Sequence, residues 1–155
     1  MRKVLVGLLA MLVAGSILYA QKPDPSMGTW KLNLAKSKFS PDPPPKNMTA
    51  KMEPAGGSLK ISVEGTDAEG KPTGWQVTAK YDGKDYPVTG SPAFDTYTLK
   101  RVNATTAQST HKKGGKVVFN NKRVLSKDGK VMTVTQTGTN PQGKPVKNVL
   151  VFDRQ

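Results

Sequence analysis

Apolar and polar residues alternate along most of the chain, with the period of two that marks a β-strand buried on one face. Leu59, Ile61 and Val63 are separated by single polar residues, and residues 75–81 repeat the pattern. Residues 117–119 form a continuous apolar run that is too short for a helix and rich in strand-forming side chains. No segment after the first twenty residues shows the period of about 3.6 residues that is typical of an amphipathic helix. The pattern therefore predicts an all-β domain.

Glycine-containing pairs mark the turns between these strands. Asp82-Gly83, Gly114-Gly115 and Asp128-Gly129 supply the positive φ angles that two-residue hairpin turns require. With these pairs as boundaries, we predict about ten strands, near residues 28–34, 46–53, 58–65, 73–81, 84–88, 95–102, 105–111, 115–126, 130–138 and 145–153.

Short strands joined by tight turns imply either a sandwich or a closed barrel. We favour an antiparallel up-and-down β-barrel, because the pattern contains no long crossover and closure removes exposed sheet edges. The proline-rich residues 40–46 cannot form a helix or a central strand. We expect them to form an extended connector between two parts of the fold.

The first twenty residues differ from the rest of the chain. Arg2 and Lys3 precede an apolar run of about 15 residues, which is shorter than the roughly 20 residues that a spanning anchor needs. A polar, proline-containing segment follows Ala20, and no basic cluster stops the run. These features predict a secretory signal helix that is cleaved after Ala20 or near Ala14, with no stable transmembrane anchor. We expect a secreted or periplasmic protein.

The predicted domains are a signal peptide at residues 1–20, a leader at 21–27 and a single barrel domain at 28–155. About 135 residues remain after cleavage, which is enough for one domain with its own core. The sequence has no cysteine, which excludes a lipid-modified lipoprotein and a disulfide framework. We expect a monomer.

The chain is strongly basic, with 24 Lys and Arg against 11 Asp and Glu. Such an excess favours anionic partners, but the lysines are scattered singly, as on an ordinary soluble sheet surface. The export signal and the lack of an exposed aromatic-glycine motif argue against nucleic acid. One group falls on two adjacent predicted strands and is the candidate surface for an anionic envelope polymer or lipid head groups: Lys112, Lys113, Lys116, Lys122 and Arg123.

The barrel domain opens with Gly28-Thr29-Trp30-Lys31-Leu32-Asn33. This opening resembles the Gly-x-Trp first strand of lipocalins and intracellular lipid-binding proteins, the calycin group of barrels, and small exported bacterial lipocalin-like proteins. The resemblance implies that Trp30 is the plug of one barrel end and that Gly28 lets the backbone pass closely. It also implies that a basic residue packs over Trp30, with Arg154 the first choice and Arg123 the second.

Two departures limit what this resemblance implies about function. Fatty-acid carriers of the group have an Arg-x-Tyr on the closing strand, where this chain offers Leu150 and Phe152. Their helical lid is missing too, and the proline-rich residues 40–46 stand in its place. The resemblance therefore implies a ligand-carrying barrel without that carboxylate clamp.

Catalytic chemistry is not evident in the sequence. The single histidine, His111, precedes Lys112 and Lys113 in a turn-like stretch, and we expect it to be an exposed loop residue. Acidic residues fall in predicted turns, where turn formation explains them. Met48 and Met52 are thioethers on one strand face, which we expect to pack in the core rather than bind a soft metal. We predict no catalysis, no metal and no cofactor.

The leading hypothesis is a barrel that binds a small hydrophobic ligand, with an envelope-associated interaction protein as the alternative and a hydrolase as a third reading. Inward aromatic residues either fill a small barrel or line a cavity within it. We expect four of them to line the ligand site: Trp75, Tyr81, Tyr97 and Phe119.

Overall fold

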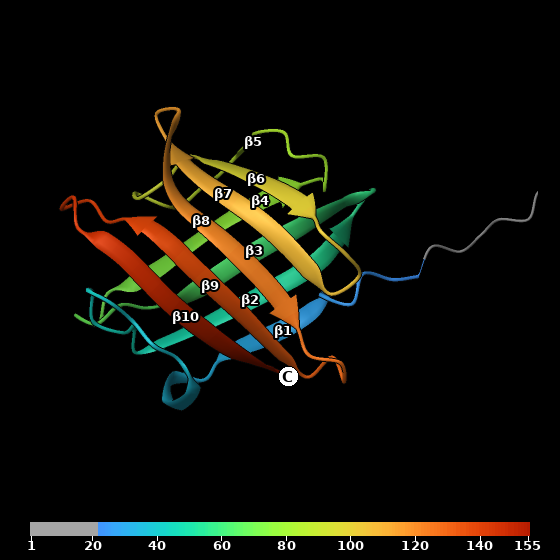
Figure 1. The fold of residues 1–155 in the computed structure, drawn as a ribbon, viewed down its shortest axis with the longest axis horizontal. Coiled ribbons are helices and arrows are strands. Elements are labelled where there is room, and N and C mark those ends of the chain that lie inside the picture. The colour runs from blue at the N-terminus through green and yellow to red at the C-terminus, as the bar shows by residue number, and fades with distance from the viewer. Residues whose placement is uncertain (1–21) are drawn as a thin grey trace, which may run out of the picture.

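The computed structural model describes residues 22–155, so the predicted signal peptide lies outside the described residues. Ten antiparallel strands form one continuous sheet that curves into a nearly closed barrel (Figure 1). The strands are β1 (Gly28–Leu32), β2 (Asn47–Ala55), β3 (Ser58–Thr66), β4 (Pro72–Ala79), β5 (Tyr86–Pro87), β6 (Thr96–Arg101), β7 (Thr106–Lys113), β8 (Lys116–Leu125), β9 (Val131–Thr139) and β10 (Pro145–Arg154). The predicted all-β, up-and-down barrel is confirmed.

The order of the strands follows the chain. Neighbouring strands in the sheet run β4-β3-β2-β1-β10-β9-β8-β7-β6-β5, so β1 joins the first and last parts of the chain. Trp30 on β1 is paired with Ala50 on β2 and with Arg154 on β10. A central β1 therefore fixes the register of both halves of the sheet.

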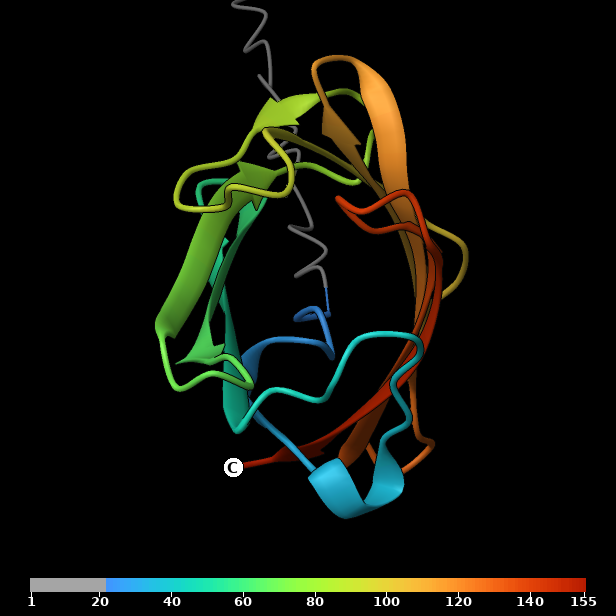
Figure 2. The same cartoon turned by 90° about the vertical axis from the view of Figure 1, so that its left-hand side faces the viewer.

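The two outer strands of the sheet, β4 and β5, close the barrel only locally. Gln76 on β4 and Thr89 just after β5 form an isolated bridge with N···O distances of 2.9 and 3.0 Å. A Cβ atom on Gly90 would lie 2.8 Å from the carbonyl oxygen of Gly74, so glycine permits the close approach of these segments. This narrow seam is the reason that the barrel is nearly, rather than fully, closed (Figure 2).

The chain between β1 and β2 crosses one end of the barrel (Figure 2). It begins with the short 3₁₀ helix η1 (Leu34–Lys36) and continues through the proline-rich connector. Lys38 exchanges two backbone hydrogen bonds of 2.8 Å with Val149, and the Lys147 amide donates to the Ser40 carbonyl at 2.9 Å. The predicted extended connector is confirmed. We call this the connector end, and the opposite end, which holds Trp30, the Trp30 end.

The core follows the alternation seen in the sequence. Inward residues from nearly every strand are buried, and they include Trp30, Leu59, Ala79, Leu99 and Met132. Within residues 22–155, no helix has the length and apolar character that crossing a bilayer requires.

Candidate functional site

A cavity of about 230 Å³ lies inside the barrel. It extends from Phe39, in the chain between η1 and the proline-rich connector, to Met132 and Phe152 deeper in the barrel. A cavity of about 150 Å³ lined by apolar side chains holds a benzene molecule. The interior of this barrel therefore has room for a molecule of one or two rings.

One wall of the cavity is apolar. It is formed by β2, β3 and β4, which contribute Met48, Ala50, Met52, Ile61, Val63 and Trp75. Trp75 also belongs to an aromatic cluster, with ring centroids 5.3 Å from Phe94 and 5.9 Å from Tyr97. Such a surface favours an apolar or aromatic ligand face.

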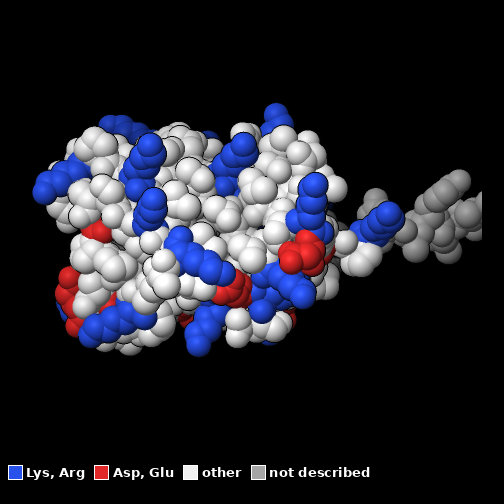
Figure 3. Space-filling model, turned by 60° about the horizontal axis from the view of Figure 1, so that its bottom comes forward, with Lys and Arg blue, Asp and Glu red and all other residues white. Residues whose placement is uncertain are grey.

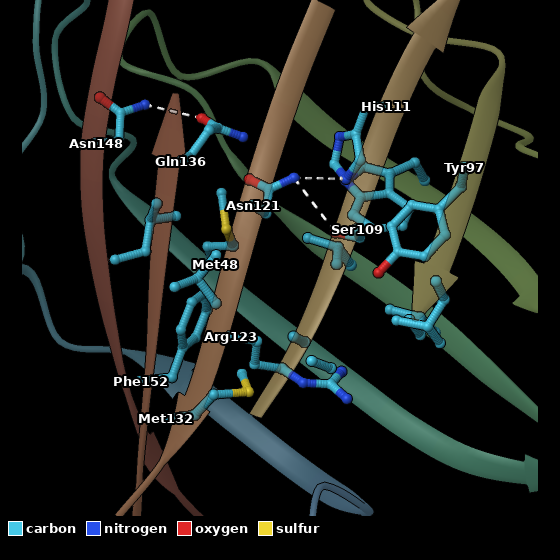
Figure 4. A pocket seen from close by; sticks show the side chains of 18 of the residues that line it. Met48, Tyr97, Ser109, His111, Asn121, Arg123, Met132, Gln136, Asn148 and Phe152 are labelled. Carbon is cyan, nitrogen blue, oxygen red and sulfur yellow. Dashed lines mark hydrogen bonds between the residues drawn. The ribbon is translucent and has the colours of Figure 1, made fainter. Parts of the chain in front are cut away.

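The opposite wall contains a row of polar side chains. Ser109 on β7, Asn121 on β8, Gln136 on β9 and Asn148 on β10 are direct cross-strand partners, so the sheet register places them side by side. All four line the cavity. The Asn148 amide donates to the Gln136 Oε1 at 3.0 Å, and the Asn121 amide lies 3.4 Å from the Ser109 hydroxyl (Figure 4). We call these four residues the polar row.

His111 lies beside the polar row and lines the cavity, so the prediction of an exposed loop histidine is wrong. Its exposure is 5%, and its ring is 4.2 Å from Phe94 and 5.0 Å from Tyr97 between centroids. Its Nε2 accepts a hydrogen bond from the Asn121 amide at 3.0 Å. Burial lowers the pKa of His111 to about 4, so the ring is neutral at neutral pH.

The error at His111 has a structural cause. Strand β7 continues to Lys113, two residues beyond the predicted end, and a register irregularity between His111 and Lys112 interrupts the regular pairing. The sequence contained a signal for the correct placement. Ala107, Ser109 and His111 occupy alternating positions, so they share one face of the strand, and all three line the cavity.

Arg123 also lies inside the barrel, where it lines the cavity, which corrects its assignment to a basic outer face. It is 9% exposed, because Asn121, Arg123 and Leu125 are the buried alternating positions of β8. Its guanidinium donates to the Tyr81 hydroxyl at 2.8 Å and contacts the Met52 sulfur at 3.2 Å. Burial raises the pKa of the nearby Tyr97 phenol, and the charge of Arg123 opposes that rise.

The four lysines of the predicted basic surface differ in their surroundings. Lys112 pairs with Asp85 at 2.8 Å, and Lys113 lies 4.0 Å from Asp95. Lys116 and Lys122 are exposed. The face drawn in Figure 3 likewise carries lysine and arginine side chains spread among neutral residues, with acidic side chains beside some of them. With Arg123 inside the barrel, the five predicted residues do not form one outer patch.

Of the four predicted wall residues, Trp75 and Tyr97 line the cavity, and Tyr81 and Phe119 do not. Phe119 packs near His111, with 6.1 Å between ring centroids. Tyr81 lies at the Trp30 end, where its hydroxyl donates to Asp24 at 2.5 Å. Strand β4 ends at Ala79, before Tyr81, so the alternation of that strand does not reach this residue.

Asp24 anchors the leader to the Trp30 end. It accepts hydrogen bonds from Tyr81, from Ser26 and from Arg101, whose guanidinium lies 3.9 Å from the centre of the Tyr81 ring. Burial by itself raises the pKa of Asp24, but the hydrogen bonds from Tyr81, Ser26 and Arg101 outweigh it and lower the pKa to about 2. The leader is therefore held by an ionised carboxylate.

Trp30 is fully buried at its end of the barrel, and its indole donates to the Ser26 carbonyl at 2.9 Å. The Arg154 guanidinium lies 4.2 Å from the Trp30 ring centre, and Arg123 does not take that place. Arg154 also donates to the carbonyls of Met27 and Pro25 at 2.6 Å. Gly28 has a φ of +127°, which residues with a side chain rarely adopt, and a Cβ there would also lie 2.8 Å from Arg154 Nη1, so the position favours glycine.

Within residues 22–155, the cavity lining has neither acidic side chains nor a group of metal ligands. The lining contains no Asp or Glu among the described residues. Within residues 22–155, no three His, Cys, Asp or Glu side chains converge as metal ligands would. The arrangement is suited to holding a molecule by apolar contact and hydrogen bonds.

No protein-family model and no curated protein matches the chain. Among solved structures, it is similar to a redesigned β-barrel, mFAP1, that was determined bound to DFHBI. The identity is 15%, the TM-score is 0.42, and the match covers 84% of this chain and 95% of that chain. The assignment of the fold rests on the strand order and pairing described above.

Proposed function

We propose that this chain is an exported, non-catalytic, lipocalin-like barrel that binds a small and predominantly apolar ligand. The observation that carries the proposal is the interior cavity, whose β2–β4 wall is formed by apolar side chains alone. Clefts and cavities with mostly apolar walls and a few polar groups are the usual form of small-molecule sites.

The size of the cavity supports a compact ligand. A volume of about 230 Å³ suits one or two rings better than a long acyl chain. The closing strand also has Leu150 and Phe152 on the cavity wall in place of a carboxylate clamp. We therefore expect binding through ring contact with the wall around Trp75.

Export and the absence of catalysis belong to the same proposal. Export is supported by the basic and apolar pattern of residues 1–20. A non-catalytic role is supported by a cavity lining that, among the described residues, contains no carboxylate to orient His111 or to act as acid or base. The alternative, an anionic envelope partner on a basic outer face, has no supporting observation, because Arg123 points inward and Lys112 is paired.

A titration with 2-methylnaphthalene tests the proposal on the purified full chain after delipidation. Trp75 lies on the cavity wall and Trp30 does not, so we expect a saturable change in tryptophan fluorescence from Trp75. Ala50→Phe places a ring in the cavity and should weaken binding more than about tenfold. Lys51→Ala, at the exposed neighbouring position, is the matched control. Absence of saturable binding to the folded wild-type protein contradicts the proposed function.

A further inference from the structure

The polar row keeps hydrogen-bonding groups that no described residue uses. The Gln136 side chain accepts from Asn148 through Oε1, which leaves its Nε2 as a free donor. The Asn121 side chain donates through Nδ2 to His111 and Ser109, which leaves its Oδ1 as a free acceptor. Gln136 and Asn121 are cross-strand partners, so a donor and an acceptor lie next to each other on the cavity wall (Figure 4).

His111 adds an independent sign of a missing partner. Because Nε2 accepts the hydrogen bond from Asn121, the ring proton lies on Nδ1. Nδ1 is the one buried side-chain nitrogen or oxygen in residues 22–155 that has no hydrogen-bond partner. An unsatisfied buried donor is destabilising, and native proteins rarely keep one without a reason. An acceptor atom of a bound molecule would satisfy it.

The polar row favours an uncharged ligand edge. Asn121, Gln136, Ser109 and Asn148 are neutral, and so is His111 at neutral pH. Arg123, the one charged residue in the described cavity lining, lies two residues farther along β8 toward the Trp30 end, and its guanidinium is hydrogen-bonded to Tyr81 and contacts Met52. The polar row therefore offers hydrogen bonds without a counter-charge.

We propose that the polar row binds the edge of a small, planar, uncharged ring compound. This edge has a hydrogen-bond acceptor next to a donor, as in a lactam. The donor of Gln136 and the acceptor of Asn121 pair with that edge, and the apolar wall around Trp75 and Met48 covers the face of the ring. This inference rests on the proposed function, because the same cavity holds the ligand.

Two ligands of nearly equal shape test the inference on the full chain. 2-Quinolinone presents a carbonyl next to a ring N–H, and 2-methylnaphthalene has the same two fused rings without polar atoms. Sites built to form hydrogen bonds reject isosteres that lack them. We expect 2-quinolinone to bind at least about tenfold more tightly. Equal or weaker binding of 2-quinolinone overturns the inference and leaves the proposed function intact, whereas failure of both ligands to bind overturns both.

Substitution of Gln136 tests whether this side chain causes the preference for 2-quinolinone over 2-methylnaphthalene. Gln136→Met keeps the length of the side chain and removes its donor, so 2-quinolinone should bind about tenfold more weakly, with little change for 2-methylnaphthalene. Thr137→Val, at the exposed next position of β9, is the matched control, and circular dichroism confirms that each variant is folded. An unchanged ratio of the two affinities in a folded Gln136→Met variant contradicts the assigned role of Gln136.

The histidine supplies a readout that does not depend on a variant. His111 is the single histidine in the sequence, so its ring ¹⁵N and proton signals are unambiguous in an NMR spectrum. Asn121 bonds His111 Nε2 and would also bond the ligand edge, so saturation with 2-quinolinone should shift the His111 ring signals more than saturation with 2-methylnaphthalene does. Equal shifts with the two ligands would place the hydrogen-bonding edge elsewhere and overturn the proposal.

Discussion

His111 couples the stability of the barrel to pH. Its pKa is about 4 in the folded protein and 6.5 in an unfolded chain, so the unfolded state takes up the proton first as the pH falls. The contribution of a neutral His111 is complete above pH 6.5 and is lost between there and about pH 4. We expect the free energy of unfolding in urea to fall by about 3 kcal/mol across that window.

The control for this pH effect is His111→Phe, which cannot titrate. Asp24 interferes little, because its pKa is lowered to about 2 and its contribution is lost mainly below its ordinary value of 3.8, with only the first part of the loss above pH 4. Urea unfolding of this variant should be nearly independent of pH between 6.5 and 4. A wild-type stability that stays constant over the window would contradict the burial of a neutral His111.

Arg154 stabilises the Trp30 end through its planar geometry as well as its charge. Its guanidinium stacks on Trp30 and reaches the carbonyls of Met27, Pro25 and Gly129 at the same time. Lysine keeps the charge but cannot form this fork of hydrogen bonds. We expect Arg154→Lys to lower the free energy of unfolding by about 2 kcal/mol. Lys147→Met, at an exposed position of the same strand, should change it by less than about 0.5 kcal/mol, and comparable losses in both variants would contradict this role.

The residue-scale predictions from sequence succeeded where a local pattern fixes the environment. Trp75 and Tyr97 occupy inward positions of regular strands, and alternation placed them on the cavity wall. Arg123 shows the limit, because its charge suggested the outer surface while its position between Asn121 and Leu125 determined the inner one. Periodicity was the better guide at that position, since a buried arginine needs partners that only the folded chain brings near.

At the scale of elements, most strand boundaries could be predicted because hairpin turns interrupt the alternation. The predicted strand at residues 84–88 is the main difference, since β5 contains only Tyr86–Pro87. Proline has no amide hydrogen to donate, and beyond it the chain continues with a hydrogen bond from the Val88 amide to the Asp95 carbonyl and with the isolated bridge from Thr89 to β4. The seam between β4 and β5 joins Gln76 to Thr89, which are close in the sequence, but it is a single bridge outside the two-residue β5, and no alternating pattern marks it.

Substitution of Gly138 on β9 tests how closely β8 and β9 approach each other. A Cβ atom at this position would collide with the carbonyl oxygen of Val118 and lie 2.9 Å from the Cα of Phe119. Gly138→Ala must therefore displace β8 from β9, and we expect thermal or urea unfolding to show a loss of about 2–3 kcal/mol.

Gly129→Ala is the matched comparison for Gly138→Ala. Gly129 has a φ of +69° in a turn, and a Cβ there meets no atom within 4 Å. Gly129→Ala should lower the free energy of unfolding by only about 1 kcal/mol, because the positive φ is the single source of strain. A Gly138→Ala variant that is as stable as Gly129→Ala would show that β8 and β9 do not pack as described.

At the scale of the whole molecule, the sequence left a filled and a hollow interior as alternatives. The cavity results from side chains on eight of the ten strands, so its volume depends on a register that no single segment contains. The polar row has the same origin, because Ser109, Asn121, Gln136 and Asn148 are neighbours only after four strands pair. The barrel could be predicted from the sequence, and the two different walls of its cavity could not.

The central claim is that the apolar wall inside the barrel is a ligand site. The most direct measurement is a methyl NMR titration of the full chain with 2-methylnaphthalene. We predict saturable shifts for the methyl groups of Met48, Ile61 and Val63, which line the cavity, and none for Val117, which is exposed on β8. Shifts confined to exposed methyl groups, or no shift at any cavity methyl group, would contradict the account.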